Sequence, residues 1–258
     1  MTGTERVERG RPAIHGRVAG LPEAARQQNL RAYLAALSGL LMLADLYLIF
    51  MVAPTASADH LWHLQRVMYF HVPIAIMSFL AFFLVFVASI AYLVRRNERW
   101  DTVAHACAEV GVVFVTMALL TGIIWARPIW GHWWTWEPRL TTTLILWLIY
   151  VAYLMIRAYA PNRTKGALYS AVVGIIGFVD VPIVYYSVVW WRSIHPSPVV
   201  GPLSQAGALN GDMYGVLLFS FITFFVLFVY LMLERASLRD AEDQIGRLRS
   251  SLRRSGRL

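Results

Sequence analysis

The chain has a single cysteine, Cys107, and few charged residues. One cysteine excludes an internal disulfide. Only 15% of the 258 residues are charged, whereas 58% are hydrophobic, and this balance excludes both a disordered chain and an ordinary soluble domain. The sequence also lacks a phosphate-binding loop and an adjacent nucleophile–base pair, so it predicts no ATP hydrolysis and no nucleophilic catalysis. We therefore expect a membrane protein that is not an enzyme.

Long apolar runs are abundant. A helix that crosses a bilayer needs about 20 mostly apolar residues. Six runs reach this length: residues 31–53, 72–94, 104–125, 140–160, 167–189 and 213–233. Ala-Ser-Ala at 56–58 resembles a signal-peptidase site, but the run before it is longer than a signal peptide's apolar region, so we expect the first helix to be retained. The predicted fold class is all-α, a polytopic membrane protein with six transmembrane helices.

Two basic segments flank this transmembrane domain. The predicted organisation is a basic arm (1–30), the six-helix domain (31–233) and a basic tail (234–258). In the tail region Leu231, Leu238, Ile245 and Leu252 recur every seven residues, which is typical of a short heptad seam. The pattern fits a solvated helix near anionic lipid and also a helix that docks to a partner.

The positive charges predict the orientation. Nineteen of the 23 Lys and Arg residues lie in the N-terminal arm with its boundary residue Arg31, in the two short loops with Arg157 just before the second, and in the tail. The other four lie in the longer loops: Arg66, Arg127, Arg139 and Arg192. Because cytoplasmic loops are rich in Lys and Arg, both termini are predicted to be cytoplasmic and the longer loops to face outward. The net charge of +8 is spread over ends and loops, so it does not indicate nucleic-acid binding.

Tryptophan is concentrated on the predicted outer face. Eight of ten tryptophans fall in the outward loops, and five lie within WARPIWGHWWTWEPRL (125–140): Trp125, Trp130, Trp133, Trp134 and Trp136. Three of these follow the i, i+3, i+4 spacing of one helix face, which predicts a short amphipathic helix on the outer surface. Its indole rings would suit a large, flat, apolar ligand. The alternative is a plain aromatic belt at the membrane interface.

Glu137 and Pro138 are expected to end this surface helix. Arg139 then lies where the fourth span begins. It has two possible uses that the spacing does not separate: its side chain extends to lipid phosphate, or it pairs with Glu137 or with a ligand carboxylate.

Two histidines are predicted at the same outer face. His71 precedes the second span, with Pro73 expected in the first helical turn, and His195 lies in the third outer loop. Two neutral imidazoles on opposite sides of a flat macrocycle would complete an octahedral iron. The outward cations Arg66, Arg127, Arg139 and Arg192 would meet its propionates. His132, inside the tryptophan cluster, is a rival ligand.

These motifs resemble a known family. WGHWWTWEPRLT (130–141), MYFHVP (68–73) and WWRSIH (190–195), set among six spans, are similar to cytochrome c maturation protein C, also called haem exporter protein C. The likeness covers about residues 60–233. It maps the family's two outer histidines onto His71 and His195, and its tryptophan motif, with Gly131, onto 130–141. Glu137 replaces the usual aspartate, and His132 is unexpected.

The resemblance implies a role in c-type cytochrome biogenesis. Such a protein holds haem b transiently, with bis-histidine iron, at the outer face of the inner membrane and presents it to a haem chaperone. Its implied partners are the membrane and ATPase subunits of an ABC transporter and a small single-span membrane protein.

A different class of function has some support. Asp45, Glu109 and Asp180 fall within predicted spans, and intramembrane acids are functional candidates in ion-coupled or substrate transporters. The alternative is that these acids form hydrogen bonds between helices.

Overall fold

The computed structural model describes residues 21–54, 63–191, 193–204, 207 and 209–255. These residues form helices and connecting loops, without a strand. In chain order the elements are α2 (Leu21–Tyr47), the π-helical turn η1 (Leu48–Val52), the 3-10 turn η2 (Leu64–Arg66), α3 (Val67–Arg95), α4 (Glu98–Trp130), α5 (Pro138–Tyr159), α6 (Arg163–Phe178), α7 (Asp180–Trp190) and α8 (Gly211–Arg254).

Six of the helical stretches are long and apolar enough to cross a membrane, which confirms the predicted fold class. They are Ala25–Val52, Leu64–Arg95, Glu98–Trp130, Pro138–Tyr159, Arg163–Trp190 and Gly211–Arg254. Most extend beyond the predicted runs, because polar residues continue a helix after the apolar stretch ends. The longest extension is in α8, which passes without a break from the sixth span into the tail. The division into arm, domain and tail stays a prediction, and most of the arm lies outside the described residues.

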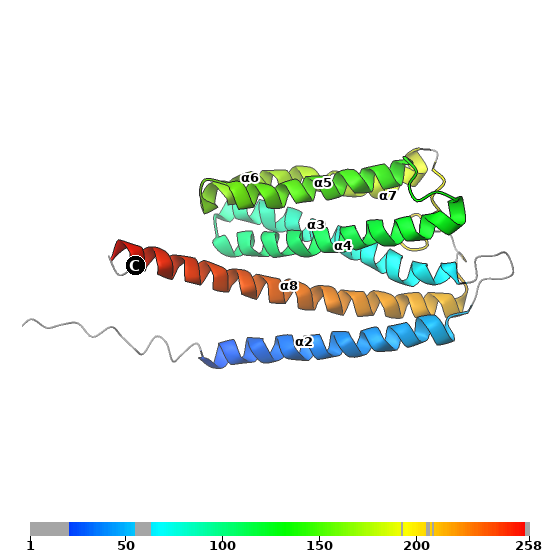
Figure 1. The fold of residues 1–258 in the computed structure, drawn as a ribbon, viewed down its shortest axis with the longest axis horizontal. Coiled ribbons are helices and arrows are strands. Elements are labelled where there is room, and N and C mark those ends of the chain that lie inside the picture. The colour runs from blue at the N-terminus through cyan, green and yellow to red at the C-terminus, as the bar shows by residue number, and fades with distance from the viewer. Residues whose placement is uncertain (1–20, 55–62, 192, 205–206, 208, 256–258) are drawn as a thin grey trace, which may run out of the picture.

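The helices are arranged in layers (Figure 1). Helices α5, α6 and α7 lie on one side, α3 and α4 in the middle, and α8 and then α2 on the other side. The start of α2, the end of α8 and the short α3–α4 and α5–α6 connections all lie at one end of the bundle, which we call the terminal end. The segments after α4 and after α7 lie at the opposite end. The side of the membrane that each end faces stays a prediction.

Small residues allow α3 and α4 to approach closely. A Cβ built on Gly111 of α4 would lie 2.7 Å from Phe82 Cε1 and 3.0 Å from Ala81 Cβ. The Phe82 ring has no exposed surface, and it stacks on Tyr150 of α5 with a centroid separation of 3.7 Å. The Gly111 site therefore brings three helices together around one core.

We predict that Gly111→Ala lowers stability by about 1–3 kcal/mol, because the added methyl overpacks the core. The measurement is the thermal unfolding midpoint of the detergent-purified protein. Gly39→Ala in α2 is the matched control, since a Cβ there meets nothing within 4 Å and alanine favours the helix by about 1 kcal/mol. Equal midpoints for Gly111→Ala and the unsubstituted protein would contradict the prediction.

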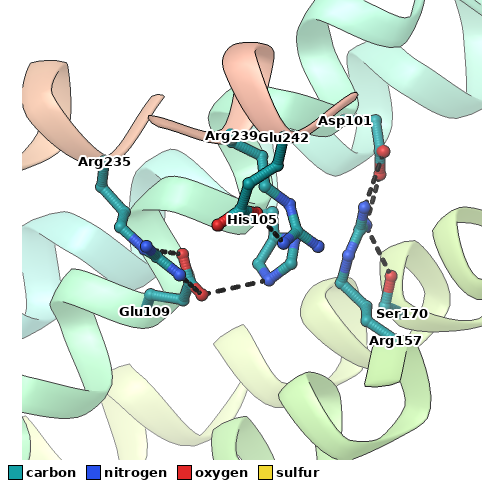
Figure 2. A network of polar contacts seen from close by, with 8 residues as sticks. All are labelled: Asp101, His105, Glu109, Arg157, Ser170, Arg235, Arg239 and Glu242. Atoms are coloured by element: carbon teal, nitrogen blue, oxygen red, sulfur yellow. Dashed lines mark hydrogen bonds and ion pairs between the residues drawn. The ribbon is translucent and has the colours of Figure 1, made fainter. Parts of the chain in front are cut away.

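A polar network joins the helices at the terminal end (Figure 2). Glu109 of α4 accepts hydrogen bonds of 2.6 Å from both Nε and Nη2 of Arg235 on α8. His105 Nε2 lies 3.5 Å from the same carboxylate. Nearby, Arg157 of α5 pairs with Asp101 of α4. The network ties α4 to α5 and to α8.

The three acids predicted within spans lie on three different helices. Glu109 of α4 forms an ion pair with Arg235. Asp45 of α2 is fully buried, and its Oδ1 accepts a hydrogen bond of 2.8 Å from Ser220 Oγ of α8. Asp180 is the buried first residue of α7. In the part of the chain that the structure describes, no three acid, histidine or cysteine side chains gather into one potential ion site.

Candidate functional site

A cavity opens at the opposite end of the bundle, between α3, α4, α5 and the segment after α7. It is partly open to the outside, and an adjoining cavity shares part of its wall. Seven residues line both cavities: His71, Ala75, Phe79, Trp125, Arg139, His195 and Pro196. We call the combined space the histidine pocket.

His71 reaches this pocket from α3, with its ring held by α4. Its Nδ1 lies 3.0 Å from Thr121 Oγ1. The Thr121 hydroxyl in turn donates to the Met117 carbonyl at 2.8 Å. Because that hydroxyl proton is used on its own helix, the oxygen acts as the acceptor from His71. The ring proton is therefore assigned to Nδ1, so the lone pair lies on Nε2.

Trp125 and Gly122 confine the same imidazole ring. The Trp125 ring meets the His71 ring edge-on, with centroids 5.8 Å apart. A Cβ on Gly122 would lie 3.2 Å from His71 Cε1, so glycine leaves the space that the ring occupies. The orientation of His71 is thus fixed by one face of α4.

His195 enters the pocket from the segment after α7. Its Nδ1 lies 2.9 Å from the Pro196 carbonyl oxygen. A carbonyl only accepts, so Nδ1 carries the proton and Nε2 is free. Burial lowers the pKa of His195 to about 4, and the positive charge of Arg139 adds to this effect. The imidazole is therefore neutral at pH 7, as a metal ligand must be.

The predicted role of Pro73 as a helix start is wrong. Helix α3 begins at Val67 and contains Pro73 in its interior. The turn η2 leads directly into α3, so the helix is established before the proline. Membrane helices tolerate an interior proline when neighbours satisfy the freed carbonyl. His71 therefore takes its position from the helix itself.

The predicted surface helix in the tryptophan-rich stretch is also wrong. Helix α4 continues to Trp130, and the chain then runs without helix from 131 to 137. Gly131 ends the helix with a φ of 77°, a left-handed conformation that favours glycine, and its N–H donates to the Arg127 carbonyl at 3.0 Å. Glu137 then caps α5 by accepting a 2.8 Å hydrogen bond from Leu140 N. The two end signals lie too close together for a helix between them.

Without a helix, the tryptophans do not share one face. Trp125, Trp130 and Trp134 line the histidine pocket. The Trp130 ring lies 6.3 Å from the His195 ring, centroid to centroid. Trp133 and Trp136 are 58% and 75% exposed and do not line it. The indole wall is thus smaller than predicted, and part of it comes from the last turns of α4.

Only one of the predicted outward cations that the structure describes lines the pocket. Arg139 contributes to both cavities, and its Nη1 is buried without a hydrogen-bond partner among the described residues. Arg127 is exposed, donates to the Gly131 carbonyl at 2.6 Å and contacts the Trp133 ring. Arg66 lies beside the Phe50 ring, away from the pocket lining. Arg192 lies outside the described residues.

The rival ligand His132 is exposed and does not line the histidine pocket. Sequence reasoning missed Thr121 and Gly122, which hold His71. A signal for them was present, because Ala118, Thr121 and Trp125 recur at helical spacing. It pointed to a face of α4, but not to the histidine that the face contacts.

Several polar groups around the pocket have no protein partner. Within the described residues that line it, these are Trp125 Nε1, Trp134 Nε1 and Arg139 Nη1. Buried polar groups are normally hydrogen-bonded to protein, water or ligand, so these atoms are available to a partner from outside the chain. All three are donors, which fits a ligand that carries acceptors such as carboxylates.

The fold and the pocket define a multi-pass helical membrane protein with histidine, tryptophan and arginine side chains around a cavity at one end. Comparison with known proteins gives the family. A family model described as Heme exporter protein C matches residues 22–249, and the chain belongs to this family.

Three relatives carry the same name. The protein from Bradyrhizobium diazoefficiens is 35% identical over 168 residues, which is 65% of this chain and 64% of the relative. The Haemophilus influenzae protein is 32% identical over 170 residues, 66% of this chain and 69% of the relative. The Escherichia coli protein is 33% identical over 160 residues, 60% of this chain and 65% of the relative. The chain thus spans just under two thirds of the first relative's length.

Proposed function

We propose that this protein binds haem in the histidine pocket and hands it on for c-type cytochrome biogenesis. The main observation behind the proposal is that His71 and His195 line one pocket, each with Nδ1 hydrogen-bonded to protein so that the lone pair lies on Nε2. Two such imidazoles are the ligand set of a bis-histidine iron. The relatives' name, Heme exporter protein C, supports haem as the substrate.

The remaining pocket residues fit the same substrate. Trp125, Trp130 and Trp134 offer flat apolar contact to a macrocycle. Arg139, with its unpaired Nη1, is the residue to meet a propionate. Bound haem would supply the iron and its redox chemistry, and this chain orients it and excludes water. Trp133, Trp136, Arg66, Arg127 and His132 are left without a role in holding it.

We further propose that the pocket faces the periplasmic side of the inner membrane. The concentration of Lys and Arg at the terminal end supports cytoplasmic termini. Haem would then be presented to a haem chaperone. The sequence contains no phosphate-binding loop, so in this proposal ATP hydrolysis belongs to a partner subunit of an ABC-type complex that also holds a small single-span protein. An ion-coupled transporter is less well supported, because Glu109 is already paired and the three acids lie apart.

The test is a haem titration of the detergent-purified protein, followed by absorption spectroscopy. We expect one haem per chain with the low-spin spectrum of bis-imidazole iron. The control is the same titration into empty detergent micelles. A spectrum that stays identical to the micelle control would overturn the proposed function.

A further inference from the structure

Two irregular segments meet beside the histidine pocket and are joined by a single carboxylate. Glu137 ends the tryptophan-rich segment, and Ser193 lies in the segment after α7. Glu137 Oε2 accepts a hydrogen bond from Ser193 Oγ. The other oxygen, Oε1, caps α5 at Leu140 N. Each oxygen thus serves a different element.

The connection continues to the histidine. Ser193 Oγ also accepts a hydrogen bond of 3.1 Å from the backbone N–H of His195. The chain of contacts therefore runs from the start of α5 through Glu137 and Ser193 to His195. His195 has no helix to fix it, unlike His71, because it lies after the end of α7.

We propose that Glu137 and Ser193 are positioning residues that hold His195 in the histidine pocket. Glu137 is buried, with 8% of its surface exposed, so solvent screens its charge little and its hydrogen bonds are strong. The same helix start carries Arg139 and Leu140, which line the pocket. The Glu137–Ser193 contact therefore sets the distance between His195 and the wall made by α5. This inference rests on the proposed haem site.

The test separates this role from simple helix capping. Ser193→Ala removes the contact to His195 but leaves the Glu137 cap of α5 intact. We expect haem affinity to fall about tenfold or more, since loss of a partner that orients a metal ligand costs about 10–100-fold. We also expect part of the iron to become high-spin, and added imidazole to restore the low-spin spectrum. Ser193→Thr keeps the hydroxyl and should keep both affinity and spin state.

Ser204→Ala is the matched control, because this serine lies in the same connection and donates only to the Gly201 carbonyl, at 2.7 Å. A second readout needs no haem. Hydrogen–deuterium exchange of peptides covering 193–198 should be faster in Ser193→Ala and unchanged in Ser204→Ala. If Ser193→Ala binds low-spin haem as tightly as the parent and exchanges at the same rate, the positioning role is refuted while the haem site stands. If the parent itself binds no haem, the proposed function fails, and the exchange data alone decide whether the contact orders this segment.

Discussion

Replacing both His71 and His195 with alanine should abolish low-spin haem binding. The two side chains supply the only free imidazole nitrogens among the residues that line the described pocket. Loss of partners that merely orient a metal ligand costs about 10–100-fold in affinity, so loss of both ligands should cost more than about 100-fold. The measurement is the Soret band of the haem-loaded double variant against that of the parent protein.

The single variants and one control sharpen this result. His71→Ala and His195→Ala should each leave a five-coordinate, high-spin iron, because one imidazole remains. His132→Ala is the control, since His132 is exposed and outside the pocket lining. An unchanged Soret band in the double variant would refute ligation by these two residues. Loss of binding in His132→Ala alone would transfer the ligand role to that histidine.

The sequence predicted the parts of this protein that depend on local pattern. Long apolar runs predict membrane helices, because a segment in lipid must pair its own backbone groups within a helix. All six predicted spans are present among the described residues. His71 and His195 were expected at the same end of the bundle, because each lies next to the outer end of a predicted span. Both line one pocket. Their role as iron ligands remains a proposal.

The parts that failed depend on end signals that compete with periodicity. Trp130, Trp133 and Trp134 have helical spacing, but Gly131 already ends α4 at a positive φ and Glu137 begins α5. Two strong cap residues six positions apart leave no room for a helix, whatever the spacing of the aromatic residues. The helix start predicted at Pro73 was also wrong, because α3 already begins at Val67, before the proline.

Contacts between residues far apart in the sequence were beyond prediction. Thr121 and His71 are 50 positions apart, and Ser193 and Glu137 are 56 apart. The local sequence around each of these residues does not identify the residue that it contacts. The same limit applies to Arg157, which was counted only as a topology signal, and which the structure places against Asp101 in the polar network of Figure 2.

Arg157→Met should therefore destabilise the whole bundle. The side chains of Arg157 and Asp101 are only 6% and 4% exposed, and one of their two hydrogen bonds joins Nη2 to Oδ2 at 2.7 Å. Arg157 Nη1 also donates to Ser170 Oγ of α6 at 3.2 Å. Removing the cation leaves a buried carboxylate without its partner, at a cost of about 3–5 kcal/mol. The thermal midpoint of the detergent-purified protein should fall by roughly 6–20 °C.

Two further variants show whether the unpaired charge is the cause. The double variant Asp101→Asn with Arg157→Met removes both charges and should recover most of the lost stability, because the main cost is the buried carboxylate and not the missing contact. Arg239→Met breaks a more exposed pair with Glu242, whose side chain is 52% exposed, and should cost about 1 kcal/mol or less. If the double variant melts no higher than Arg157→Met, the loss comes from packing around the arginine stem, and the charge argument is wrong.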